Sequence, residues 1–158
     1  MQRPITGFGT DELNDPVAYL SCGHRQHVRH APPFINRPWV ESEEGRRAML
    51  GTNLNCVRCD QMEWPEHFVA YKQTPVFTQD TLPEGLKKNH DTKAGVWAKI
   101  HVLEGVLHYT IESLGVERDL LPGLPGIVLP EVLHHVAADQ GPVRFYVEFY
   151  RAPEPVAR

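Results

Sequence analysis

All three cysteines of this 158-residue chain lie within its first 60 residues, and each has histidines or a second cysteine close by. Residues 22–24 read Cys-Gly-His and residues 56–59 read Cys-Val-Arg-Cys, with 31 residues between the two groups. Thiolates and imidazoles are the usual ligands of tetrahedral zinc, and two ligands from each of two short segments complete such a site. We therefore predict a structural zinc site formed by Cys22, His24, Cys56 and Cys59, with His27 as the alternative to His24.

Two other interpretations of the cysteines are open. Cys56 and Cys59 form a Cys-x-x-Cys pair, which also serves thiol exchange when it opens a helix after a strand, but no apolar strand-like run precedes Cys56. Three buried free cysteines would behave as small apolar residues in a reducing compartment, which leaves the adjacent histidines unexplained. The ligand pattern favours the metal site.

A second group of histidines lies in the part of the chain that has no cysteine. His90 precedes a predicted strand and His134 follows a turn at Pro130, and imidazoles placed at the mouth of a β-barrel can converge on a metal or a small ligand. We predict that His90 and His134 bind a metal or a small ligand there. If the ligand is a metal, the candidates for further ligands are Glu131, Glu148 and His135.

The elements that position the first group are short. Residues 5–10 and 17–21 have the composition of strands, and the second of them leads directly into Cys22. Residues 42–50 are predicted to form a helix, because Ser42 can cap it, acids fill its first turn and a glycine follows it. This helix returns the chain toward Cys56.

A hairpin is predicted around Gly105, because residues 96–103 and 106–111 alternate in hydropathy and the connection contains a glycine. In this hairpin His101 and His108 would lie opposite each other on one face. No carboxylate or cysteine accompanies them at that spacing, so a partly exposed polar face is favoured over a metal site.

A second hairpin is predicted from residues 134–138 and 143–150, with a turn at Asp139-Gln140-Gly141-Pro142. It would place His134 opposite Val147 or Glu148, so that Glu148 could act as a ligand or support one. Short strands with turn signals at this density indicate a small barrel or a jelly roll.

Charge and composition divide the chain. Residues 1–62 contain seven arginines, no lysine and seven acids, whereas residues 63–158 contain nine basic and thirteen acidic residues. The formal net charge of -4 and the pI near 6.1 argue against binding to nucleic acid or to an anionic membrane. The predicted domains are a zinc-ribbon-like α+β domain over 1–62, a linker over 63–74, a β-barrel over 75–153 and a tail over 154–158.

The second part resembles the bacterial YeaR and TehB-type cupins, which are related to tellurite resistance. The resemblance is carried by Leu82-Pro83, His90, Thr92-Lys93, Trp97, residues 102–105, Pro130-Glu131, His134 and residues 147–151. It implies a double-stranded β-helix, the cupin jelly roll, with a divalent metal in the barrel mouth. Metal cupins usually carry His-x-His, and here Thr92 stands at the second histidine position, so the metal needs ligands from elsewhere.

The first part resembles a small bacterial family of unknown function that occurs alone or beside cupins of this kind. Its pattern is residues 22–30 with the sequence CGHRQHVRH, Pro32-Pro33, residues 37–40 and the Cys56-x-x-Cys59 pair. This resemblance implies no activity.

Together these features predict a metal-binding cupin that handles a small toxic or oxidising species, related to tellurite resistance or nitrosative stress, with a small molecule or an inorganic oxyanion as its ligand. The alternative is a non-enzymatic regulatory or adaptor module stabilised by zinc. No nucleophile–base pair is identifiable, so no catalytic residue is assigned. The chain lacks an apolar stretch of about 20 residues and a signal-peptide core, so a cytoplasmic protein is expected, compatible with a homodimer.

Overall fold

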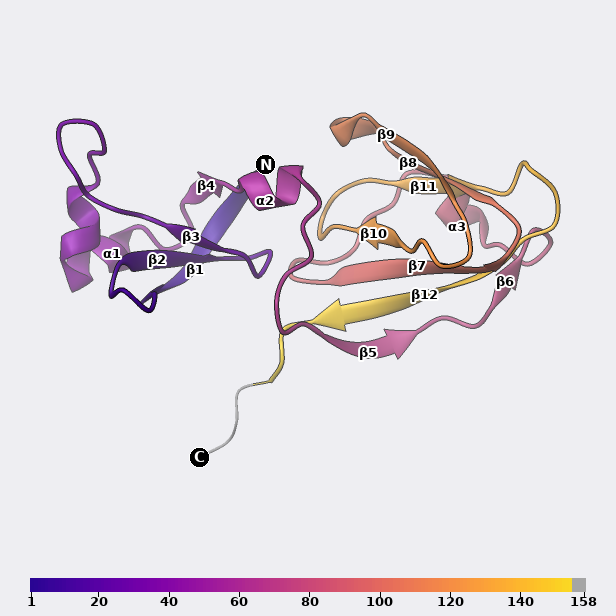
Figure 1. Ribbon diagram of the computed structural model, residues 1–158, viewed down its shortest axis with the longest axis horizontal. Helices are drawn as coiled ribbons and strands as arrows, with labels where there is room; N and C mark the ends of the chain where they lie inside the picture. The colour runs from indigo at the N-terminus through magenta and orange to yellow at the C-terminus, as the bar shows by residue number, and fades with distance from the viewer. Residues whose placement is uncertain (155–158) are drawn as a thin grey trace. The chain divides into compact units, whose positions relative to one another are not determined.

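The computed structural model describes residues 1–154, which form two compact units. Unit 1 comprises Met1–Glu66, and unit 2 begins at His67. Antiparallel strands form the sheets of both units (Figure 1). None of the described helices is long and apolar enough to span a membrane. The predicted linker over 63–74 stays a prediction, and the predicted tail over 154–158 lies outside the described residues except for Glu154.

Unit 1 is built on one four-stranded sheet in which the strands follow the order β3-β2-β1-β4. The strands are β1 (Gln2–Thr10), β2 (Pro16–Leu20), β3 (Arg25–His27) and β4 (Asn53–Asn55). Ile5, Val17, Ala18 and Leu20 are buried and form its small core. A core of this size gives little stability by itself, so a metal that ties loops together would add substantially.

Three short helices complete unit 1: η1 (Pro38–Glu41), α1 (Glu43–Ala48) and α2 (Val57–Asp60). The helix predicted over 42–50 is confirmed as α1, and its cap is the expected one, because the Ser42 hydroxyl accepts a hydrogen bond from the Gly45 N–H at 3.0 Å. After α1, β4 carries the chain to Cys56, which precedes α2.

Unit 2 contains two sheets. The first has the order β10-β7-β12-β5, with β6 paired to β12, and the second has the order β11-β8-β9. The first sheet consists of β5 (Val69–Gln73), β6 (Phe77–Thr78), β7 (Trp97–Glu104), β10 (Gly126–Val128) and β12 (Arg144–Arg151). The second consists of β8 (Leu107–Ile111), β9 (Val116–Leu120) and β11 (His135–Ala137), and the short helices are α3 (Glu84–Lys87) and η2 (Glu112–Leu114).

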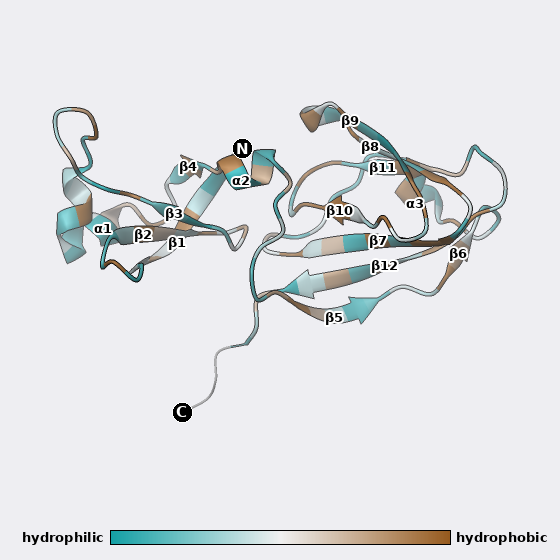
Figure 2. Ribbon diagram, viewed as in Figure 1, coloured by the Kyte–Doolittle hydropathy of each residue, from teal (hydrophilic) through white to brown (hydrophobic). Residues whose placement is uncertain are grey.

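The core of unit 2 lies on the inner faces of its sheets. Tyr109, Phe145, Leu107 and Ile111 are at most 1% exposed. Polar and apolar segments both occur along β7 and β12 (Figure 2), because each strand has one face toward the core and one face away from it. This alternation fixes which side chains of β7 and β12 face the interior.

Both predicted hairpins of unit 2 are wrong. β7 pairs with β10 and β12, whereas β8 pairs with β9 and β11, so the chain crosses from one sheet to the other at Gly105. Likewise β11 pairs with β8 and not with β12, so His134 does not lie opposite Val147 or Glu148. A tight turn between two alternating segments looks the same in sequence whether the chain folds back within a sheet or changes sheets.

Candidate metal centre and cavity

The two cysteine groups of unit 1 are presented by two tight turns. Cys22 follows β2 in a turn closed by hydrogen bonds from the Leu20 N–H to the His24 carbonyl (3.0 Å) and from the Gly23 N–H to the Leu20 carbonyl (2.9 Å). Gly23 has a φ of 93°, which suits glycine. Cys56 caps α2 and Cys59 lies within it, so both thiols of the second group project from one helical turn.

These turns bring together Cys22, His24, Cys56 and Cys59, which are all buried, with their ligand atoms within 4.8 Å of one another. His24 Nδ1 lies 3.4 Å from the Sγ of Cys22, 3.4 Å from that of Cys56 and 3.5 Å from that of Cys59. The Sγ atoms of Cys22 and Cys56 are 3.8 Å apart. Tetrahedral zinc with bonds of about 2.3 Å to sulfur and about 2.05 Å to nitrogen requires about 3.8 Å between sulfurs and about 3.5 Å between sulfur and nitrogen.

The surroundings of the cluster orient its ligands. His24 Nε2 lies 2.7 Å from the Glu63 carbonyl oxygen, which can only accept, so Nε2 carries a proton and Nδ1 is the nitrogen that faces the cluster. Arg3 is 3% exposed, and its Nε donates a hydrogen bond to Cys59 Sγ at 3.4 Å. The sequence did not point to Arg3 as a site residue. The one signal for it is its position two residues before Ile5, on the inward face of β1.

The thiols and the imidazole of the cluster share protons through hydrogen bonds. Hydrogen bonds from Cys22 and Cys59 lower the pKa of the Cys56 thiol strongly, which favours a thiolate there. Burial lowers the pKa of His24, but hydrogen bonds with Cys56 and Cys59 outweigh it and raise that pKa to about 9. A metal would displace the remaining ligand protons, so its affinity for this set must rise with pH.

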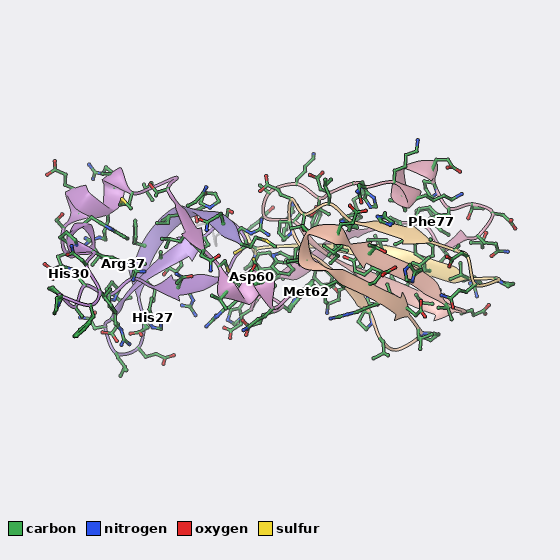
Figure 3. The ribbon with its side chains drawn as sticks, turned by 90° about the horizontal axis from the view of Figure 1, so that it is seen from above. His27, His30, Arg37, Asp60, Met62 and Phe77 are labelled. Atoms are coloured by element: carbon green, nitrogen blue, oxygen red, sulfur yellow. The ribbon has the colours of Figure 1, made fainter. Side chains whose placement is uncertain are left out.

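His27, the alternative ligand, is not part of the cluster. Its Nε2 lies 2.7 Å from Asp11 Oδ2, and its side chain is 52% exposed. In Figure 3 it is well separated from Asp60, the residue that follows Cys59. Of the two histidines left open by the sequence, His24 is therefore the one that the structure brings to the cysteines.

His90 and His134 lie side by side in unit 2. Their backbones form an isolated bridge, with the His90 N–H donating to the His134 carbonyl at 3.0 Å and the His134 N–H to the His90 carbonyl at 2.9 Å. Their ring centroids are 4.2 Å apart. His90 Nδ1 donates to the Lys88 carbonyl and His134 Nδ1 to the Val132 carbonyl, both at 2.9 Å, so each Nε2 carries a lone pair.

Both rings border a cavity of about 240 Å³. Its wall is largely apolar, with contributions from both sheets and from β6, including Phe77 (Figure 3), Ile100, Val128, Val136, Phe145 and Val147. His134 is 4% exposed, and burial, with a smaller contribution from neighbouring His90, lowers its pKa to about 4. At neutral pH this imidazole is uncharged and accepts hydrogen bonds through Nε2.

The other candidate ligands lie elsewhere. Glu148 accepts hydrogen bonds from Tyr150 and from His101 Nε2, the latter at 3.1 Å, on the face of β12 opposite to Val147. Glu131 is exposed at a positive φ of 57° and does not border the cavity, and His135 contacts Asn89 Oδ1 at 2.8 Å. Within the described residues, only the cluster of unit 1 gathers three or more potential metal ligands.

His101 and His108 do not face each other either. The ring of His101 stacks on Tyr146 with centroids 4.9 Å apart, whereas His108 contacts Asp119 at 3.0 Å and Glu117 at 2.9 Å. Hydrogen bonds to Asp119 and Glu117 raise the pKa of His108. These two histidines belong to different sheets.

The division of sites between units follows the division into families. Residues 6–63 match a family described as a protein of unknown function, DUF3565, and residues 72–147 match the TehB-like domain. The chain therefore contains a segment similar to the DUF3565 family followed by a segment similar to the TehB-like domain. All four cluster residues lie in the DUF3565 domain, and His90 and His134 lie in the TehB-like domain.

Two curated relatives are similar to part of this chain. The probable S-adenosyl-L-methionine-dependent methyltransferase TehB of Haemophilus influenzae is 46% identical over 41 residues, which are 26% of this chain and 14% of TehB. The uncharacterized protein YeaR of Escherichia coli K12 is 24% identical over 102 residues, which are 59% of this chain and 86% of YeaR. The segment matched in sequence spans about a seventh of the length of TehB.

Solved structures have the same fold as the TehB-like domain. A crystal structure of an Escherichia coli K12 protein aligns with a TM-score of 0.55 at 22% identity, over 61% of this chain and 93% of that protein. The structure of TehB from Haemophilus influenzae aligns with a TM-score of 0.50 at 32% identity, over 55% of this chain and 32% of TehB. The mainly β architecture of the TehB-like domain is therefore shared with both structures.

Proposed function

We propose that the chain is a metal-binding cupin protein in which zinc stabilises unit 1 and unit 2 handles a small toxic or oxidising species at His90 and His134. The observation that carries this proposal is the pair of imidazoles that border the cavity, each held by a hydrogen bond from Nδ1 to a backbone carbonyl, which leaves Nε2 for a metal. That arrangement is typical of imidazoles that bind a metal.

The role of unit 1 in this proposal is architectural. Three thiolates and one imidazole supply all four ligands of tetrahedral zinc, and a closed site stabilises the fold without activating a substrate. The distances among the four ligand atoms support zinc at this position. Three cysteines used as ligands require a reducing compartment, which supports the proposal of a cytoplasmic protein.

The role of unit 2 is chemical. Two sheets that border one cavity support a jelly-roll barrel, and a divalent metal on the two Nε2 atoms would keep open positions for a ligand. Such a metal would supply Lewis acidity toward a bound small molecule. The chain's own residues would hold both imidazoles in the correct tautomer and keep bulk water away from the apolar part of the cavity. A homodimer is compatible with this proposal.

Metal analysis of the purified full chain tests the proposal. We expect tightly bound zinc that is lost in Cys56→Ser and His24→Gln but kept in His27→Gln, the matched control. We expect a second, exchangeable metal that is lost in His134→Gln but kept in His135→Gln. If zinc alone is found, and no variant in unit 2 changes the metal content, the zinc-stabilised adaptor module becomes the better function.

A further inference from the structure

The side chains that border the cavity of unit 2 offer acceptors and no free donor. Thr92 Oγ1 already donates to the carbonyls of Val96 and Leu129, at 2.7 and 3.3 Å. Thr74 Oγ1 donates to the Pro75 carbonyl at 2.9 Å. The remaining polar side chains are the two imidazoles and Asp91, and a carboxylate only accepts.

The hydrogen bonds that the two imidazoles already make leave them as hydrogen-bond acceptors toward a ligand. Because each Nδ1–H is directed to a backbone carbonyl, each neutral ring presents the lone pair of Nε2 as its free polar atom. No lysine or arginine borders the cavity anywhere in the described part of the chain. An oxyanion that entered without a cation would lose its hydration and meet only accepting side chains.

The rest of the wall favours an apolar body. Side chains such as Ile100, Phe145, Val147 and Phe149 contribute only carbon atoms. The cavity measures about 240 Å³. A dry cavity of about 150 Å³ holds benzene, so this one accommodates a ring with a short substituent or about ten non-hydrogen atoms.

We propose that this cavity binds a small organic molecule with an apolar body and a neutral or cationic hydrogen-bond-donating head, such as a phenol, alcohol or amine, and rejects free inorganic oxyanions. In the cavity without a metal, a phenol or alcohol head donates its one proton to Nε2 of His90 or of His134, and an amine head can donate to both. The proposal rests on the assignment of the small-molecule site to unit 2. Of the ligand classes expected for this site, the proposal excludes the free inorganic oxyanion.

Three ring compounds of similar size test the charge of the head group. Phenol, benzylamine, benzoate and sodium selenite are each titrated into the full chain after any exchangeable metal of unit 2 has been measured and removed. The Ile100 and Val147 methyl signals are followed by NMR. We expect saturable shifts with phenol and benzylamine, and binding of benzoate and selenite at least tenfold weaker. Tighter binding of benzoate or selenite than of phenol, or no methyl shift with any ring compound, would overturn the proposal.

His134→Gln adds a second measurement, because its amide supplies a donor where the imidazole offers a lone pair. It should reduce the ratio of phenol affinity to benzoate affinity at least threefold, and His135→Gln should leave that ratio unchanged. An unchanged ratio in a folded His134→Gln variant counts against the proposal. The metal content is measured on the same samples. Phenol binding without a second metal refutes only the metal on the histidine pair, and a second metal without ring binding refutes only the organic ligand.

Discussion

Replacing Arg3 with methionine is expected to weaken zinc binding by unit 1 about tenfold to a hundredfold, the range typical of residues that contact metal ligands. Arg3 is the only buried arginine or lysine among residues 1–154, at 3% exposure, and its Nε lies 3.4 Å from Cys59 Sγ. Methionine keeps much of the volume and the flexible stem but removes the charge and the donor. The change therefore isolates the electrostatic contribution of Arg3.

The expected magnitude follows from charge balance. Three thiolates, a neutral imidazole and a divalent zinc ion together carry one net negative charge, which is costly to bury unless a cation compensates it. A hydrogen bond to a charged group contributes about 1.5–3 kcal/mol, and each 1.4 kcal/mol corresponds to about a factor of ten in affinity. The guanidinium of Arg3 thus accounts for about one to two orders of magnitude in zinc affinity.

The assay is competition for zinc against a chromophoric chelator, with Co²⁺ substitution to verify that the site stays tetrahedral. Arg58→Met is the matched control, because Arg58 lies in the same helix as Cys59 but is 54% exposed and pairs with Glu63 at 3.4 Å. Arg3→Lys keeps the charge but not the planar donor group, so its zinc affinity should lie between those of Arg3→Met and Arg58→Met. A folded Arg3→Met variant with wild-type zinc affinity would refute the charge-balance reasoning.

Two further predictions concern unit 2. The pKa of His134 is lowered from 6.5 to about 4 in the folded state, so folding favours its neutral form. The contribution of this group to the free energy of unfolding is therefore complete above about pH 6.5. That contribution falls by about 3 kcal/mol at most as the pH drops from about 6.5 to 4. Urea unfolding at pH 7 and pH 4.5 should show this loss in the wild type and a smaller one in His134→Gln. Gly105→Ala should destabilise unit 2 by about 2 kcal/mol more than Gly123→Ala. Both glycines have positive φ, but an added Cβ at Gly105 would lie 2.1 Å from the Pro142 carbonyl oxygen, whereas nothing lies within 4 Å at Gly123. Equal unfolding midpoints for the two alanine variants would contradict this.

What the sequence predicted well is local. Cysteines are rare, and ligands two or three residues apart are held together by a single turn, so the cluster residues could be named before the fold was known. The features that the sequence did not predict are contacts between residues far apart in the chain. Arg3 and Cys59 are 56 residues apart, and nothing in the sequence around either residue indicates their contact. The crossings between sheets were missed for the same reason, since the partners of β7 and β8 are chosen by the packing of the whole unit.

The choice of imidazole tautomer explains why the two units suit different tasks. In unit 1 the Glu63 carbonyl holds Nε2–H of His24 and leaves Nδ1 for three enclosed sulfurs, so every polar atom of the ring has a partner within the domain. In unit 2 the Lys88 and Val132 carbonyls hold Nδ1–H and leave both Nε2 atoms at the cavity. The first arrangement stabilises unit 1, because all of its metal ligands are used within the domain. The second leaves two acceptors beside an apolar wall, and a molecule from outside the chain must satisfy them.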